Sequence, residues 1–594
     1  MLVNGKQLSD EMAQVIAVVT VDTSLHLPAM FELHVADTLE NTSFRWIDGD
    51  EFKVGTRVKI LACARDAQGL TPRSQAKPLI EGTITALECE FDAGGHATLI
   101  VRGYDDSHRL HIGRKTATYL KMTDSAIVQK VAQDAGLKVK VTGTTNQHDY
   151  VLQNNQTDMS FLRTRAWRVG FELCVDEAGT LHFRKANQKQ HDGPTLEWGK
   201  ELFSFRPHLS AMQQTQRVIV RAWDTQSKTL VKGQADRASE ARQAGVQPEF
   251  AAAKAKAEMV VSEIPGLNGG SATTLAESIA HEIQTEFVKA EGVCMGQPSV
   301  RAGNMITLKG LGTKFGGQYL ITAATHRYAT DSGYTVSFSV SGRHPDTLAH
   351  LLGSEPSHDP ASGRVQGMAI GLVTNVNDPN GLGRVKVKFP WLGDQVESTW
   401  CRMAAPMAGS GRGFYFLPEV NDEVLVAFEH GDPNVPFVVG TLWNTSDKPP
   451  KKNSEVFSGG KVNERILRSR SGHEIVFGDK EGAETVTIVD KNKNSIVIDS
   501  AKDTLTITVK GDCNVKANGK CVVQASQDIQ LASSGADVSI ECVNFNVKAK
   551  ANAKIESQAQ LDLESAMVNV TSKGPLAVEG KPVQINKTAL VVLP

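Results

Sequence analysis

The sequence predicts a mainly β protein with some α-helix. We expect an N-terminal β-barrel region with helical insertions, a small barrel, and a C-terminal intertwined trimeric β-helix shaped as a triangular prism. Three observations predict this fold class. Aromatic residues are only 6% of the 594 residues whereas glycine occurs 51 times, a balance that favours strands and many turns. Apolar and polar residues alternate through long stretches of residues 15–342. Beyond about residue 485, a short apolar unit returns every eight residues.

Alternation with a period of two predicts antiparallel strands in the first part of the chain. The clearest runs are residues 15–21, 57–62, 81–91 and 97–105. The period becomes helical in four segments, which are residues 123–137, 157–170, 235–261 and 271–291. In the first of these, Thr123 can cap the helix and Gly136 can end it.

Shifts in composition divide the chain into parts. Residues 354–364 are rich in Pro, Ser and Gly and predict a linker. The next 80 or so residues hold about five short runs of β-branched residues, which fits a small barrel. The expected parts are 1–353 for the N-terminal region, 354–364 for the linker, 365–446 for the small barrel, 447–484 for a connector, 485–588 for a β-helix needle and 589–594 for a tip.

The repeat consists of pairs of apolar residues at positions i and i+2, which lie on one face of a strand. From Ile507 to Ile585 the second residues of the pairs follow one another at steps of seven to nine residues. The predicted inward residues are Leu505, Ile507, Cys513, Val515, Cys521, Val523, Ile529, Leu531, Val538, Ile540, Phe545, Val547, Ile555, Leu561, Leu563, Val568, Val570, Leu576, Val578, Val583 and Ile585.

Two apolar residues per strand cannot form a core alone, so each unit needs stacked neighbours. Three chains wound around one axis, each giving one strand per layer of a prism, would enclose such a thin column and leave only the two ends as sheet edges. At ~4.8 Å between strands the shaft would be roughly 50–60 Å long. The alternative is a single-chain parallel β-helix, but the coils of that fold are usually longer than eight residues.

The eight cysteines lie at positions 63, 89, 174, 294, 401, 513, 521 and 542. None forms a C-x-x-C motif, and we expect reduced, mostly buried thiols. Cys513 and Cys521 are eight residues apart because they occupy the inward position of successive repeats. They are therefore interpreted as small apolar fillers that require no sulfur chemistry.

The last residues differ from the repeat. The predicted binding surface for a tip protein is Leu590, Val591, Val592, Leu593 and Pro594. An apolar run at the end of a shaft would leave an exposed patch, and such patches usually mark binding surfaces. We expect this layer to close the prism and to dock a partner with its end face.

No catalytic, cofactor or metal site is predicted. The histidine pairs His108/His111 and His182/His191 lack an H-E-x-x-H context and a nearby cysteine pair. The glycines of GSGRG (409–413) fit a loop with positive φ, and SRSGHE (469–474) lacks the G-x-S-x-G elbow of a nucleophile. Lys and Arg (64) nearly balance Asp and Glu (66), which gives no reason to expect nucleic acid as a partner.

The small barrel resembles the OB-fold of the VgrG/phage-spike family of contractile injection machines. The resemblance rests on GLVTNVNDPNGLGRVKVKFPW (371–391) and GRGFYFLPEVNDEVLVAFEHGDPNVPFVVGTLWN (411–444). Residues 296–328 resemble the phage tail-hub part of the family more loosely, and the octads resemble its trimeric β-helix needle. The resemblance thus covers almost the whole chain.

The resemblance implies a homotrimeric spike and hub that caps a hexameric inner tube, adapts threefold to sixfold symmetry, and pierces a target envelope with a PAAR-type tip protein. Other implied partners are baseplate proteins and effector cargo, with membrane contact only during piercing. The N-terminus has no signal peptide, so we expect folding in a bacterial cytoplasm. The particle would be phage tail-like, either released extracellularly or membrane-anchored.

Some relatives carry a lysozyme domain before the needle or an effector domain after it. Only about 40 residues separate Trp443 from the first octads, and nine follow Ile585, so we expect neither domain and no enzymatic activity. Two alternatives remain open: a lysozyme-like cell-wall hydrolase hidden in the N-terminal half, and a receptor-binding fibre.

Overall fold

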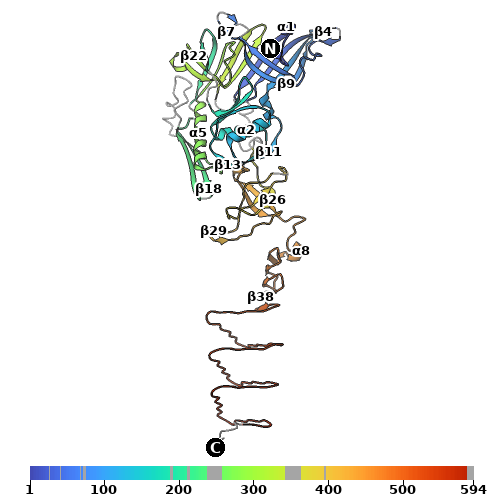
Figure 1. The fold of residues 1–594 in the computed structure, drawn as a ribbon, viewed down its shortest axis with the longest axis vertical. Helices are drawn as coiled ribbons and strands as arrows, with labels where there is room; N and C mark the ends of the chain where they lie inside the picture. Colours follow the sequence, from blue (N-terminus) through green and yellow to red (C-terminus); the bar gives the residue numbers. More distant parts are fainter. Residues whose placement is uncertain are drawn as a thin grey trace. The chain divides into compact units, whose positions relative to one another are not determined.

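The computed structural model describes residues 1–584, apart from 26, 41, 67–68, 71–74, 187–191, 211–213, 226, 237–256, 342–362 and 394–395. It divides into two compact units, Met1–Arg465 and Ile466–Pro594. The first unit is built mainly from β-sheets with a few helices (Figure 1). The predicted fold class, mainly β with some α, is therefore confirmed.

The largest sheet joins the two ends of the N-terminal region. Its strands, in spatial order, are β17 (Leu202–Leu209), β21 (Val288–Met295), β25 (Gly333–Val340), β24 (Ala323–Ala329), β3 (Ile16–Ser24), β4 (Met30–Glu40), β10 (His96–Asp105), β9 (Lys77–Phe91), β6 (Arg57–Ala62), β1 (Leu2–Val3) and β2 (Lys6–Gln7), with β5 (Ser43–Phe44) beside β4. In Figure 1 the blue strands near the N-terminus lie beside the yellow-green strands, because β3 pairs with β24.

Alternation explains this sheet. Phe31, Leu33 and Val35 are fully buried on β4, while the residues between them are partly exposed, as expected for a strand with one face on the core. Helix α1 (Asp10–Val15) starts at Ser9, whose side chain accepts a hydrogen bond from the Met12 N–H. The small hairpin of β7 (Arg65–Asp66) and β8 (Gly69–Leu70) lies nearby in the sequence.

Two predicted helices are confirmed in the part of the chain that follows β10. Helix α2 (Asp124–Asp134) is capped by Thr123, and α3 (Asp158–Arg168) is capped by Thr157. The turn after α2 passes through Gly136 at φ 73°, a conformation that favours glycine. The neighbouring elements are η2 (Asp106–His111), β11 (Lys115–Thr123), β12 (Lys138–Val141), β13 (Gln147–Gln156), β14 (Phe171–Val175) and β15 (Thr180–Lys185).

The other two predicted helices are partly wrong. Helix α5 (Gly269–Thr285) confirms most of the prediction for 271–291, but the chain re-enters the large sheet at Val288 as β21. For 235–261, the ends are strands: β19 (Thr229–Asp236) and β20 (Glu258–Val261), which both pair with β18 (Arg217–Asp224). Ladder hydrogen bonds and the β-branched Val260 and Val261 outweigh the helical tendency of the alanines there. Residues 237–256 lie outside the described part of the chain.

The rest of the N-terminal region forms a small sheet of β16 (Asp192–Glu197), β22 (Met305–Lys309) and β23 (Gly317–Leu320), with α6 (Gly312–Phe315) between the last two. Helix α5 packs its apolar face on β18 and β19, where Val218, Val220 and Leu275 are buried.

A five-stranded sheet follows, as the sequence predicted for the small barrel. Its order is β27 (Lys386–Lys388), β26 (Ala369–Asn375), β31 (Glu423–Phe428), β32 (Pro436–Thr441) and β28 (Arg402–Met403). The alternate valines of β26, β27, β31 and β32 fill its core around Phe389. The bridge between Val385 and Cys401 joins the two ends of this order, which curls the sheet toward a closed barrel. The remaining short elements are β29 (Ala408–Gly409), β30 (Arg412–Gly413), η4 (Glu429–Gly431), α8 (Asn453–Val456), β33 (Phe457–Ser458) and β34 (Lys461–Val462).

Strand β13 and helix α3 hold the barrel to the N-terminal region. The Tyr150 hydroxyl donates to the carbonyl of Glu397 at 2.8 Å, and the Leu152 N–H donates to Oδ1 of Asn434 at 2.8 Å. Arg168 forms an ion pair with Asp432 at 3.2 Å. Several directional contacts from one strand and one helix therefore fix the orientation of the barrel on its neighbour.

A buried ion pair joins helix α3 to helix α2. Nε of Arg165 is 2.6 Å from Oδ1 of Asp124, and their side chains are 6% and 1% exposed. Nε2 of His148 lies 3.0 Å from the other carboxylate oxygen. Burial alone would raise the pKa of Asp124, but the bonds with His148 and Arg165 outweigh burial and lower that pKa.

Replacing Asp124 by alanine should destabilise the N-terminal region strongly, because Arg165 would remain buried without its carboxylate. We expect a loss of about 3–5 kcal/mol, measured as a lower urea midpoint by tryptophan fluorescence. Asp134→Ala on the same helix is the control: its pair with Lys130 is about half exposed, and its loss should cost roughly 0.5 kcal/mol or less. Equal effects of the two substitutions would contradict the assignment.

Candidate functional site

The second unit begins with an antiparallel meander that carries the first apolar pairs. Its strands are β35 (Glu464–Arg468), β36 (Glu474–Gly478), β37 (Thr485–Val489), β38 (Ser495–Asp499) and β39 (Thr504–Thr508). The pair Ile496/Ile498 lies opposite Ile488/Val486 on one side and opposite Ile507/Leu505 on the other. The predicted pairs of these strands therefore share one face of a sheet.

This part of the chain pairs with itself, whereas the sequence predicted the prism from residue 485 onward. The turns between strands β36 to β39 contain residues with positive φ, namely Gly482, Lys493 and Asp503. The second apolar residues here stand at 488, 498, 507 and 515, so the repeat shortens from ten residues to nine and then to eight. An interval of nine or ten residues holds a five-residue strand and a turn that reverses the chain. An interval of eight residues leaves fewer residues for such a turn.

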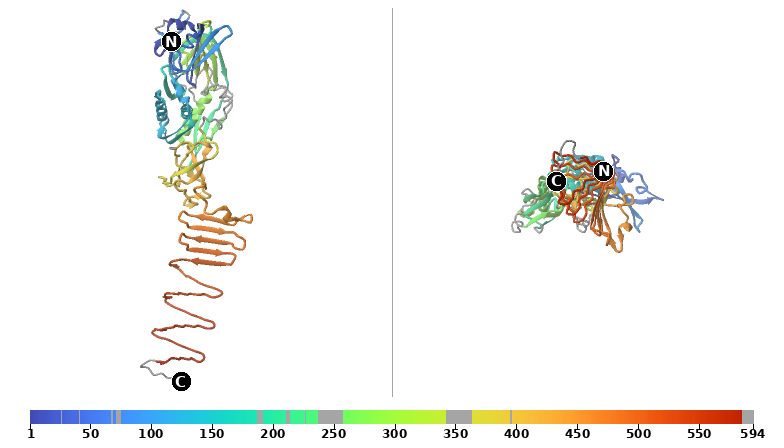
Figure 2. Two further views of the ribbon diagram at one scale, coloured as in Figure 1. Left: turned by 90° about the vertical axis from the view of Figure 1, so that its right-hand side faces the viewer. Right: turned by 90° about the horizontal axis from the view of Figure 1, so that it is seen from below.

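Beyond Thr508 the backbone runs back and forth in repeated swings (Figure 2, left), and its bends are in step with the apolar repeat of the sequence. The bends begin at residues 510, 518, 526, 534, 543, 550, 558, 566, 573 and 581. The second apolar residues of the pairs stand at 507, 515, 523, 531, 540, 547, 555, 563, 570 and 578. Each bend thus begins three residues after a second apolar residue, including where the interval is nine or seven residues.

The apolar side chains of this stretch are exposed in the single chain. Val515 is 81% exposed, Leu531 82% and Leu563 72%, and the structure assigns no strand between residues 509 and 584. Cys513 and Cys521 are exposed free thiols at equivalent positions, each five residues before a bend. A regular series of exposed apolar pairs usually marks a surface that binds another protein segment. Which of these residues face a common core stays a prediction.

The predicted tip and the last inward residue cannot be compared with the structure. Residues 585–594, which include Ile585 and the predicted binding surface from Leu590 to Pro594, lie outside the described part of the chain.

The histidines that sequence analysis weighed for catalysis lie in different surroundings. His182 contacts the Asp176 carboxylate at 2.8 Å, and His191 lies outside the described residues. The ring of His111 is largely enclosed, and burial, with smaller contributions from the neighbouring Arg163 and His108, lowers its pKa to about 4. Within the described residues, no group of three or more His, Cys, Asp or Glu side chains could hold a metal ion.

Two glycine- or serine-containing motifs also have structural roles. Gly411 of GSGRG has φ 65° and turns the hairpin between β29 and β30, as predicted. In SRSGHE, the His473 N–H donates to Oγ of Ser469 at 3.0 Å, so both residues form the turn between β35 and β36.

None of the helices that the structure describes is long and apolar enough to cross a membrane.

Comparison with known proteins identifies the first region of the chain. A family model described as the Alg8 N-terminal domain matches residues 1–330, more than half of the 594 residues. The chain belongs to the Alg8 N-terminal domain family. A second model, described as the type VI secretion system/phage-baseplate injector OB domain, matches residues 369–443 of this Alg8-family chain. The OB-fold implied for the small barrel is thereby confirmed.

Curated relatives of the Alg8-family chain are VgrG proteins. The type VI secretion system spike protein VgrG1a of Pseudomonas aeruginosa is 25% identical over 240 residues, 32% of this chain and 37% of the relative. VgrG5 of the same species is 38% identical over 110 residues, 16% of this chain and 14% of the relative. The actin cross-linking toxin VgrG1 of Vibrio cholerae is 32% identical over 108 residues, 18% of this chain and 10% of the relative. The resemblance to the VgrG family is confirmed, and the matches span well under half of each relative.

Solved structures show weaker likenesses. One is the E. coli c3393 protein, a component of the type VI secretion system: 15% identity, TM-score 0.45, 72% of this chain and 96% of that one. Another is the Francisella PdpA–VgrG complex in its lidded form: 8% identity, TM-score 0.47, 83% of this chain and 76% of that one. TM-scores below 0.5 do not by themselves establish a common fold, so the assignment rests on the family models and the curated relatives.

A charge at a predicted inward position should prevent assembly of the needle. In Leu563→Asp, three carboxylates would meet on the axis of a trimer, away from water. We expect the mass measured by light scattering to fall from that of a trimer to that of single chains. Asn569→Asp, which adds the same charge between Val568 and Val570 on the opposite face of the strand, should leave the trimer intact. A trimeric Leu563→Asp protein with a folded needle would contradict the model of the column.

The two repeat cysteines should be replaceable. Cys513→Ser combined with Cys521→Ser should leave the mass of the assembly unchanged, with or without a reducing agent, because their positions require only a small side chain. An assembly that dissociates on reduction, or a bound metal ion lost in the double variant, would show that sulfur chemistry holds the repeat together.

Proposed function

We propose that this chain is the central spike and hub of a contractile injection machine, and that it works as a homotrimer. The observation that carries the proposal is the injector OB domain followed by an eight-residue apolar repeat in one chain. The OB match supports the class of machine, and the VgrG relatives support the role of a spike. These relatives share only part of their length with this chain, so the role of the whole protein is the proposal.

We assign the parts as the sequence suggests. Residues 1–353 are the hub, 354–364 a linker, 365–446 the OB-fold domain, 447–484 a connector, 485–588 the needle and 589–594 the tip. The antiparallel pairing of β37, β38 and β39 supports one change to this assignment. At the base of the needle each chain would first form a sheet with its own strands, and the eight-residue repeat would begin after that sheet.

The proposed action of the needle is mechanical. Three chains would place the apolar pairs of the repeat in a dry column on their common axis, and neighbouring strands would pair along the whole shaft. At about 25 cal/mol per Å² of buried apolar surface, a column of exposed Val, Ile and Leu side chains provides a large driving force for assembly. Continuous strand pairing gives the shaft the stiffness needed to pass through an envelope without bending.

The proposed partners follow from this role. The hub would contact a hexameric inner tube and baseplate proteins, and the tip would carry a PAAR-type protein, with effector cargo travelling on the same spike. The chain would fold in a bacterial cytoplasm and become part of a phage tail-like particle, released or membrane-anchored. Its role in the machine requires no catalysis.

Two measurements on the purified chain test this function. Light scattering should give a mass of three times the 64.1 kDa of one chain. Incubation with peptidoglycan should release no soluble fragments. A monomer that digests peptidoglycan would establish the hydrolase alternative instead. A trimer that binds cells or glycans through its C-terminus but does not associate with tube protein would establish the receptor-binding fibre.

A further inference from the structure

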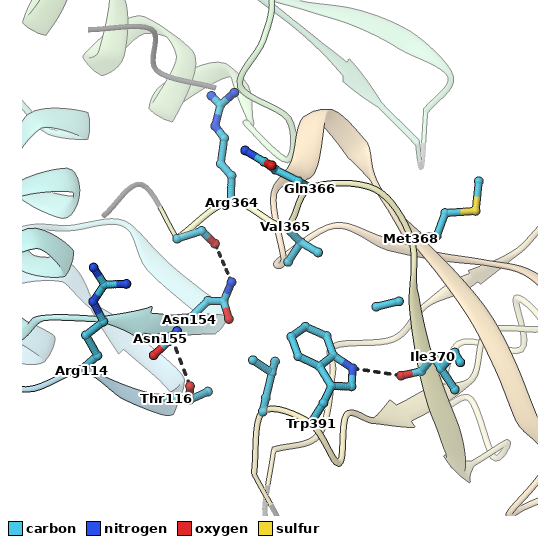
Figure 3. A pocket seen from close by; sticks show the side chains of 13 residues that line it. Arg114, Thr116, Asn154, Asn155, Arg364, Val365, Gln366, Met368, Ile370 and Trp391 are labelled. Carbon is cyan, nitrogen blue, oxygen red and sulfur yellow. Dashed lines mark hydrogen bonds between the residues drawn. The ribbon is translucent and has the colours of Figure 1, made fainter. Parts of the chain in front are cut away.

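The first unit contains a cavity that no step of the proposed function uses. It has a volume of about 800 Å³ and lies beside the contacts that hold the OB barrel to the N-terminal region (Figure 3). On one side it is lined by residues at the end of β13 and before β11, and on the other by the segment that leads into β26 and by the loop after β27. The lining residues used below are Arg114, Asn154, Val365, Met368 and Trp391.

An apolar surface forms one side of the cavity. The Trp391 indole N–H donates to the carbonyl of Ile370 at 3.0 Å, which fixes the ring while leaving 51% of the residue exposed. Val365 lies across from the ring (Figure 3), and Met368, which also lines the cavity, is 59% exposed. Because its only polar group already has a partner, the free face of the indole is available for apolar contact.

Asn154 supplies a buried hydrogen-bond acceptor. It is 8% exposed, and its Nδ2 donates to the carbonyl of Gly363 at 2.8 Å, which fixes the orientation of the amide. Its Oδ1 has no hydrogen-bond partner in the described part of the chain, and the residue lines the cavity in front of Trp391 (Figure 3). Leaving a buried acceptor unpaired is unfavourable, so a ligand that offers an N–H or O–H to this oxygen would be stabilised.

The lining is positively charged. Arg114 and Arg364 both line the cavity, and none of the described lining residues is an aspartate or a glutamate. Arg114 is exposed and forms no ion pair with the residues that the structure describes, whereas the next residue, Lys115, pairs with Asp158 at 2.7 Å. An anionic group placed beside Arg114 would therefore meet an uncompensated guanidinium, which favours carboxylates through charge-assisted hydrogen bonds.

We propose that this cavity binds an acidic peptide segment of a partner protein in extended conformation. A backbone N–H of the peptide donates to Oδ1 of Asn154, a carboxylate accepts from Arg114, and an apolar side chain packs on Trp391. A peptide offers these three groups within a few consecutive residues. Binding of a peptide at this cavity goes beyond the proposed function, which assigns the cavity no role.

Fluorescence anisotropy of labelled peptides against the full chain tests the site. The probes are short synthetic peptides in which glutamate alternates with leucine or phenylalanine, and matched peptides with glutamine in place of glutamate. We expect the acidic peptides to bind at least tenfold more tightly. Arg114→Glu and Trp391→Ala should each weaken their binding at least tenfold, while Arg412→Glu, on the exposed hairpin β29–β30, should not change it.

Several outcomes would overturn the proposal. These are the absence of binding at millimolar peptide, equal binding of acidic and glutamine peptides, and unchanged binding by Arg114→Glu. Competition by free glutarate as strong as that by the peptides would show a site for small acids and not for a peptide. Circular dichroism and the mass of each variant identify a variant that fails to fold or assemble, and Asn154→Ser, which keeps a short polar side chain, then serves as the second variant with an expected loss of binding.

Discussion

A strand with only two inward apolar residues cannot bury them by itself, and this constraint shapes the whole second unit. In residues 509–584 the apolar pairs return with every bend of the backbone, and in the single chain they are exposed. A fold of this kind gains little from contacts within one chain and much from contacts between chains. In the proposed trimer, assembly and folding of the needle would therefore be one process, and its stability would depend on the concentration of the chain.

The first unit, in contrast, buries its core within a single chain. Its sheets bury long alternating strands, and its core residues Phe31, Phe183 and Phe338 are at most 2% exposed without any partner chain. The OB barrel is fixed to it by directional polar bonds from β13 and α3, backed by the buried pair of Asp124 and Arg165. Polar contacts of defined geometry fix an orientation better than a flat apolar contact would, which suits the joint between hub and barrel in the proposed spike.

Much of this architecture could be predicted from the sequence, because the signals were periodic or local. Capping by Thr123 and Thr157 and the turn at Gly136 define α2 and α3 without reference to the rest of the chain. The alanines before Glu258 predicted a helix that runs through β20, because nothing local reports the ladder that β18 offers. Similarly, the antiparallel meander at the base of the needle depends on pairing between neighbouring strands, whose residues obey the same alternation in either arrangement.

The cavity beside Asn154 was also beyond sequence analysis. Its lining comes from residues about 210 to 280 positions apart in the chain, such as Arg114 and Trp391, and no motif connects them. The signal that identifies it is an amide oxygen left unpaired after folding, which is a property of the three-dimensional structure alone.

The fixed interval between apolar pair and bend has a consequence for the length of the shaft. The interval of nine residues from Leu531 to Ile540 is followed by one of seven to Val547, so the extra residue is cancelled within one repeat. The interval of seven residues from Leu563 to Val570 is followed by one of eight and is not compensated, yet each bend still begins three residues after its own pair. In the proposed needle, a shaft built on this repeat would therefore change its length in discrete steps, each step being one whole unit of apolar pair and bend.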